Sequence, residues 1–147
     1  MAEIGFYHLT RTGPDQALPL LLARTLAAGE RAVVLCGSAD RLGEIDTALW
    51  QAEAWLPHNR ALDEDPDFQP IWLTTDDAPA PNGARFLFLV DGVESARCAD
   101  YARVFDVFDG TDQAATEAAR RRWAEARAAG HTLAYWRQTE RGWRQGV

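Results

Sequence analysis

Apolar and polar positions alternate along the chain in a way that predicts short strands separated by helices. Several apolar runs are almost continuous, such as RAVVLC at residues 31–36 and RFLFLV at residues 85–90, which is typical of strands covered on both faces. The pattern therefore predicts an α/β fold with three layers, α/β/α, around a mostly parallel sheet. Strands are expected at residues 4–9, 31–36, 71–74, 85–90, 103–108 and 131–137, and helices at residues 14–28, 38–50 and 112–129.

Local signals refine these elements. Ser38 is in position to cap the second helix, and either Thr111 or Asp112 to cap the third. Pro19 is expected to delay or bend the first turn of its helix. The last strand alternates apolar and polar residues like an edge strand, and residues 138–147 are expected to be a polar tail. No linker interrupts the pattern, so residues 1–147 are expected to form a single domain.

The chain is acidic overall but basic at its end. It has 15 arginines, no lysine and 22 acidic residues, for a net charge of −7. Residues 120–147 hold seven arginines and two glutamates, a net of +5, whereas residues 1–119 carry a net of −12. Such a chain is a poor candidate for direct binding to nucleic acid. The basic end indicates either an acidic partner or simply a solvated, arginine-rich helix.

Composition points to a cytoplasmic protein. No apolar run approaches the ~20 residues that a membrane helix needs, and the N-terminus does not have the pattern of a secretory signal. Cys36 and Cys98 lack the spacing of a metal site or a redox pair. We therefore expect reduced thiols, no metal and no cofactor.

An α/β sheet of this Rossmann-like type often binds nucleotides, but the usual motifs are missing. There is no GxxxxGK[ST] sequence and no GxGxxG after the first strand. Residues 86–91 resemble a Walker B strand that ends in Asp91, although a turn-forming aspartate gives the same pattern. A degenerate nucleotide-binding enzyme remains the alternative interpretation.

No catalytic constellation is visible. His8, His58 and His131 are scattered, and Cys36 at the end of a strand has no base in its pattern, so a buried thiol is the simpler interpretation. Asp91 and Asp109 are expected at strand ends, either converging on a site or forming turns. We expect no catalytic residues.

The last helix carries the clearest functional pattern. At 100° per residue, Arg120, Trp123 and Arg127 fall on one stripe, with Thr116 between them, and no acidic residue shares it. Two guanidinium groups beside an indole suit the binding of an external carboxylate. Arg122 lies instead among the alanines of another face, and we expect it to reach an acid at the strand ends such as Asp109.

Tryptophans form a second cluster. Trp50, Trp55 and Trp72 are close in sequence, beside Pro57 and an acidic loop. Tryptophan is enriched at the centres of protein interfaces, and it is also often buried in cores, so the pattern alone leaves both readings open.

Five motifs occur in an order and spacing that resemble a known family, the chi subunit of bacterial DNA polymerase III. They are FYHLT (residues 6–10), RAVVLCGS (31–38), ALW to WLPH (48–58), ARRRWAEARAAGH (119–131) and AYWR (134–137). The resemblance implies a non-catalytic adaptor of DNA replication. Such an adaptor joins the clamp loader to the protein that coats single-stranded DNA.

The resemblance also implies binding residues. The acidic, aromatic-ended C-terminal tail of the single-stranded-DNA-binding protein would dock on Arg120, Trp123 and Arg127. Thr116 and Ala124 stand where well-known members have basic residues, which implies a less cationic site unless Arg121 compensates.

A second implied surface concerns other partners. The psi subunit, which connects chi to the clamp loader, or a repair helicase would use the surface of Trp50, Trp55, Pro57 and His58. Trp55 replaces a smaller aromatic residue of the family. No contact with DNA or with a membrane is implied.

Overall fold

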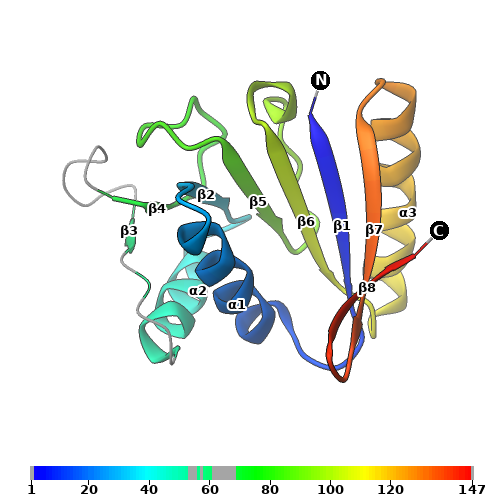
Figure 1. The fold of residues 1–147 in the computed structure, drawn as a ribbon, viewed down its shortest axis with the longest axis horizontal. Helices are drawn as coiled ribbons and strands as arrows, with labels where there is room; N and C mark the ends of the chain where they lie inside the picture. Colours follow the sequence, from blue (N-terminus) through cyan, green and yellow to red (C-terminus); the bar gives the residue numbers. More distant parts are fainter. Residues whose placement is uncertain (1, 53–55, 57, 61–68, 147) are drawn as a thin grey trace.

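The computed structural model describes residues 2–52, 56, 58–60 and 69–146. It contains an eight-stranded sheet with the strand order β3-β4-β2-β5-β6-β1-β7-β8 (Figure 1). All neighbouring strands are parallel except β7 and β8. The strands are β1 (Glu3–Leu9), β2 (Ala32–Leu35), β3 (His58–Arg60), β4 (Ile71–Thr74), β5 (Phe86–Val90), β6 (Arg103–Asp109), β7 (Thr132–Thr139) and β8 (Gly142–Gly146).

Three α-helices lie against this sheet: α1 (Pro14–Ala27), α2 (Ala39–Gln51) and α3 (Gln113–Ala128). Helices α1 and α2 cover one face of the sheet (Figure 1). Their leucines pack there on Val34, Phe88 and Phe105. Helix α3 lies on the opposite face (Figure 1). Its residues Ala119 and Trp123 join the second core cluster there. The predicted three-layer α/β fold with a mostly parallel sheet is therefore confirmed.

The connections diverge at the carboxyl ends of β1 and β6. After β1 the chain passes through α1 to β2, whereas after β6 it passes through α3 on the other face to β7. Doubly wound sheets place their ligand sites where two neighbouring strands send the chain in opposite directions. Here the two ends are joined by the backbone N–H of Gly110, which donates to the carbonyl of Leu9 at 2.7 Å. This divergence positions the site described below.

The predicted polar tail and edge strand were wrong. Residues 142–146 form β8, which pairs antiparallel with β7, so β7 is an internal strand. The side-chain carbonyl of Gln138 accepts hydrogen bonds from the backbone N–H groups of Thr10, Arg11 and Thr12, which fastens this hairpin to the end of β1. The sequence of this hairpin is largely polar because only part of each strand packs on the core, through side chains such as Trp143.

The helix ends agree with most of the sequence signals. The hydroxyl of Ser38 accepts a hydrogen bond from the backbone of Arg41, and the Asp112 carboxylate accepts one from Ala114, so both capping predictions are confirmed. Pro19 lies inside α1, which already begins at Pro14, so the expected delay of the first turn is wrong. Strand β3 was not predicted.

Helix α3 is joined to the sheet by a buried ion pair. The guanidinium of Arg122 donates to both carboxylate oxygens of Asp106, at 2.7 and 2.9 Å. The side chains are 10% and 3% exposed. Burial raises the pKa of Asp106, and the nearby Arg122 opposes that shift. The expected partner Asp109 was wrong, because its carboxylate accepts from Thr111 instead.

Breaking this pair is expected to be costly. Arg122→Met leaves the buried Asp106 carboxylate without its partner, which should lower the free energy of unfolding by about 3–5 kcal/mol. The double variant with Asp106→Leu removes both charges and should recover much of that loss. Urea denaturation followed by circular dichroism measures both. If the single and double variants lose the same free energy of unfolding, the unpaired Asp106 charge is not the cause of the loss.

Candidate functional site

A cavity of about 450 Å³ lies between α3 and the end of the sheet. It is lined on the sheet side by Phe6, His8, Phe108 and Tyr135, and on the helix side by Thr116, Ala119, Arg120, Trp123 and Arg127. The structure thus brings the four residues of the predicted stripe to one cavity. Its size falls within the range of small-ligand and peptide-anchor pockets.

The sheet side of the cavity is set by strand register. His8 is paired with Phe108 on β6, and Phe6 is paired with Tyr135 on β7. Paired residues of neighbouring strands point to the same face, so aromatic side chains from three strands form a continuous floor. Sequence reasoning missed this floor because it depends on strand order, although the alternation of Phe6 and His8 within one strand was a visible signal.

The helix side combines an anchored indole with two exposed cations. Trp123 is half-buried and meets Phe6 edge to face, with ring centroids 5.2 Å apart. Arg120 and Arg127 are exposed on either side of it along the helix. Neither arginine forms an ion pair with any residue that the structure describes. Their guanidinium groups are therefore available to an external anion.

Thr116 has a different role from the two arginines. Its hydroxyl donates to the carbonyl of Asp112 at 3.0 Å and lies 3.4 Å from the carbonyl of Gly110. The hydroxyl is therefore engaged with the backbone, and Thr116 shapes the rim of the cavity. Arg121 is exposed but does not line the cavity.

His8 places a titratable group on the floor. Its Nδ1 contacts the hydroxyl of Tyr135. Burial lowers the pKa of His8 below its ordinary value of 6.5, and the nearby Arg137 and Arg120 lower it further, against a hydrogen bond with the backbone of Gly110. His8 is thus neutral at neutral pH, and a bound anion would favour its protonation.

The predicted second surface is described only in part. Trp50, on the last turn of α2, is 64% exposed. Trp55 and Pro57 lie outside the described residues, and of His58 only the backbone, in β3, is described. Trp72 is 6% exposed and belongs to the core. Of this surface, therefore, the structure describes one exposed indole.

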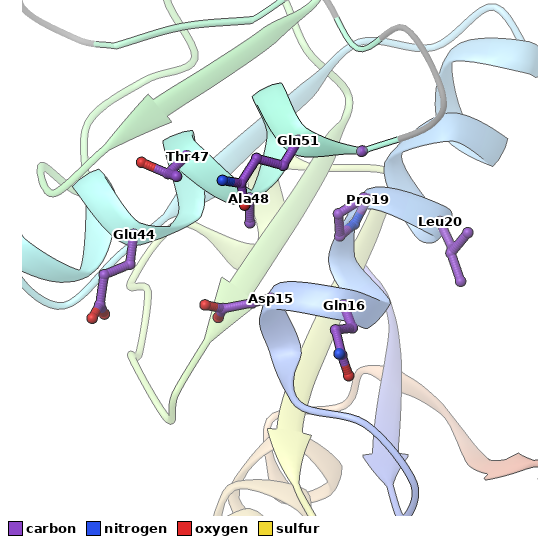
Figure 2. A pocket seen from close by; sticks show the side chains of 9 residues that line it. Asp15, Gln16, Pro19, Leu20, Glu44, Thr47, Ala48 and Gln51 are labelled. Atoms are coloured by element: carbon purple, nitrogen blue, oxygen red, sulfur yellow. The ribbon is translucent and has the colours of Figure 1, made fainter.

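A hollow of about 630 Å³ is lined by residues of both α1 and α2. Figure 2 shows its side chains on the two facing helices, with Asp15 on α1 and Glu44 on α2. Both carboxylates pair with Arg41, at 2.6 and 3.2 Å, and Arg41 also pairs with Asp91. Leu20, 65% exposed, lies on the α1 side. The rim of this hollow carries carboxylates, unlike the cavity beside α3.

The other titratable residues that the sequence singled out, Cys36, Asp91 and His131, are buried or are engaged in contacts within the fold. Burial raises the pKa of the Cys36 thiol to about 12, so it stays protonated. Asp91, the acid of the Walker B-like strand, is engaged by Arg41, and His131 accepts a hydrogen bond from the backbone of Ala2 at 3.1 Å. Among the described residues no cluster of histidine, cysteine and carboxylates is suited to a metal ion.

Within residues 2–52 and 69–146, none of the helices has the length and apolar character to cross a bilayer.

Comparison with known proteins gives one family. The model of the family described as DNA polymerase III chi subunit, HolC, matches residues 1–134 of the 147. The match includes all of α3 and the first part of β7, and it ends before β8. No curated protein matched the chain.

The close approach of Gly110 to His8 and Leu9, at the ends of β6 and β1, can be tested by substitution. A Cβ at Gly110 would fall on the His8 ring and close to the Leu9 carbonyl, so Gly110→Ala must displace one of them. We expect a loss of about 1–3 kcal/mol of unfolding free energy and a changed chemical environment of the His8 ring. Gly37→Ala is the matched control, because its Cβ would meet no atom within 4 Å. Thermal denaturation and histidine NMR signals measure the effect, and equal behaviour of the two variants would contradict the close approach.

Proposed function

The chain belongs to the DNA polymerase III chi subunit family, and from that membership we propose that it is a non-catalytic adaptor of DNA replication. In this proposal it binds the acidic C-terminal tail of the single-stranded-DNA-binding protein. Through the psi subunit it links that protein to the clamp loader. The family itself is an accessory part of the polymerase complex, which supports an adaptor in preference to an enzyme.

The observation that carries the proposal is the cavity beside α3. Two guanidinium groups, Arg120 and Arg127, lie along an aromatic hollow that contains Trp123, and neither has an ion-pair partner among the described residues. The terminal carboxylate and nearby acidic side chains of a tail would pair with the arginines. Its terminal aromatic side chain would pack beside the indole, on the floor formed by Phe6 and Tyr135.

The distribution of charge supports a peptide ligand. The net charge of −7 opposes binding to the phosphate backbone of DNA, while the local excess of arginine around α3 attracts an acidic segment. A short tail bound through exposed ion pairs and one aromatic anchor should have a Kd of roughly micromolar order, about −8 kcal/mol. Added salt should weaken binding, and many tails along coated DNA should strengthen it through avidity.

The position of Trp50 supports a second docking surface on the other side of the molecule. Trp50 lies on α2, and the stripe with Trp123 lies on α3, on opposite faces of the sheet (Figure 1). We place the psi subunit, or a repair helicase, at Trp50 together with Trp55, Pro57 and His58. Because the sheet separates the two surfaces, both partners would bind at once, as a bridging adaptor requires.

Charge reversal on α3 tests the tail site. Arg120→Glu puts a carboxylate where the tail needs a cation, and we expect the Kd for a fluorescent tail peptide to rise at least about tenfold. Arg121→Glu is the matched control, because it makes the same change of charge on the neighbouring residue outside the cavity. Fluorescence anisotropy measures both. Equal loss in the two variants, or full binding by Arg120→Glu, would reject the site.

The state of His8 predicts how binding depends on pH. A bound carboxylate should raise the pKa of His8 above its lowered value in the free protein, so binding takes up a proton. Affinity should therefore increase as pH falls through the pKa of the complex and level off below the pKa of the free protein. The same titration in His8→Gln should show a flatter pH profile between about pH 7.5 and 5.5, where the peptide carboxylates stay ionised. An unchanged pH profile in that variant would show that His8 is not the group that takes up a proton when the ligand binds.

A further inference from the structure

The β7–β8 hairpin places two arginines side by side next to the cavity. Arg137 on β7 is directly opposite Arg144 on β8, and both are exposed. Arg137 is in turn the register partner of His8 on β1, which lies on the cavity floor. A single row of paired positions therefore runs from His8 through Arg137 to Arg144.

Alternation along the strands places these two arginines on the face of the sheet that carries α3. Tyr135 lines the cavity, and Arg137 follows it by two residues, so their side chains share a face. Trp136 and Trp143 occupy the other face, where both rings contact Tyr7. The arginine pair thus continues the surface of the cavity toward the end of the sheet.

The two arginines of the hairpin are not neutralised by an acidic side chain in the part of the chain that the structure describes. Neither Arg137 nor Arg144 has an ion-pair partner among the described residues, and Glu140, at the tip of the hairpin, pairs with Arg11 at 3.6 Å. Arg137 is paired in register with His8 on the cavity floor, and its positive charge helps to lower the pKa of His8. Together with Arg120 and Arg127 on α3, the arginine pair makes a track of four exposed cations.

The platform under the track is well anchored. Gln138, which directly follows Arg137 on β7, holds the hairpin through hydrogen bonds from the backbone N–H groups of residues 10–12. Gly146 lies under the Tyr135 ring, where any Cβ would collide with it, so β8 is held close against that ring. A rigid platform lowers the entropic cost of binding a flexible ligand.

We propose that Arg137 and Arg144 bind acidic residues of the tail that lie upstream of those held at the cavity, so that the ligand runs as an extended peptide from α3 across β7 to β8. This inference rests on the proposed function and extends its site. Strands are spaced about 4.8 Å apart, so two spacings from β1 to β8 span ~10 Å, which an extended peptide covers in about three residues. The acidic residues concerned are thus about three or more positions before the peptide's anchored end.

The two arginines lie outside the part of the chain that matches the family, which ends at residue 134. The preference for an acidic peptide over single-stranded DNA follows from the net charge of −7, which disfavours a long polyanion on this molecule. DNA is therefore a separate outcome of the test.

The test uses the full chain and two synthetic peptides that end in the same aromatic residue with a free carboxylate. One carries aspartates at the third to sixth positions from its end, and the other carries serines there. For the double variant Arg137→Gln/Arg144→Gln we expect the Kd of the aspartate peptide to rise about three- to tenfold, and that of the serine peptide to stay unchanged. The matched control is Arg121→Gln/Arg141→Gln, which removes the same charge from two exposed arginines outside the track.

The outcomes separate this inference from the proposed function. If Arg120→Glu weakens binding of the aspartate peptide at least about tenfold but the hairpin variant binds it normally, or loses no more than the control does, the inference is overturned and the proposed function stands. If Arg120→Glu leaves the binding of both peptides intact, the proposed function itself fails. Binding of a fluorescent oligothymidine that depends on Arg137 and Arg144, without an effect on the aspartate peptide, would overturn the inference in favour of DNA. Thermal denaturation of each variant confirms that it is folded.

Discussion

The buried pairing of Arg122 with Asp106 fixes α3 on the sheet, and the candidate site depends on it. Helix α3 has one buried residue, Ala119, and Trp123 and Ala126 pack against the core only partly, so the ion pair adds a specific contact to a modest apolar one. The two-point contact between guanidinium and carboxylate sets its position along the sheet, because a shift of one residue would strand both charges. With α3 placed in this way, Trp123 meets Phe6 and the cavity opens between Arg120, Arg127 and the strands.

The arrangement of layers gives a physical basis for an adaptor. The candidate tail site lies on the α3 side of the sheet, and the exposed Trp50 lies on the α2 side. The two surfaces also differ in charge, since the hollow between α1 and α2 has carboxylates on its rim and the cavity beside α3 has arginines. In the proposed function, this difference would favour an acidic ligand on the α3 side and leave the α2 side to a second partner.

The sequence was sufficient for the elements whose pattern is local. The continuous apolar runs identified five of the parallel strands, and helical spacing put Arg120, Trp123 and Arg127 on one stripe. The sequence was not sufficient for features of the site that depend on the order of the strands in the sheet. The floor of Phe6, Phe108 and Tyr135 arises because β1 lies between β6 and β7, which no local pattern encodes. Strand β8 was missed for a related reason, since a strand paired on one side and half exposed reads as polar.

The candidate tail site can be tested by titrating the protein with a fluorescent peptide from the tail of the host's own single-stranded-DNA-binding protein, with and without the terminal aromatic residue of that peptide. The proposed site requires that the complete tail binds with a Kd of roughly micromolar order and that removal of the last residue abolishes binding, because the Trp123 cavity loses its occupant. Equal affinity for both peptides, or no binding of either, would contradict it.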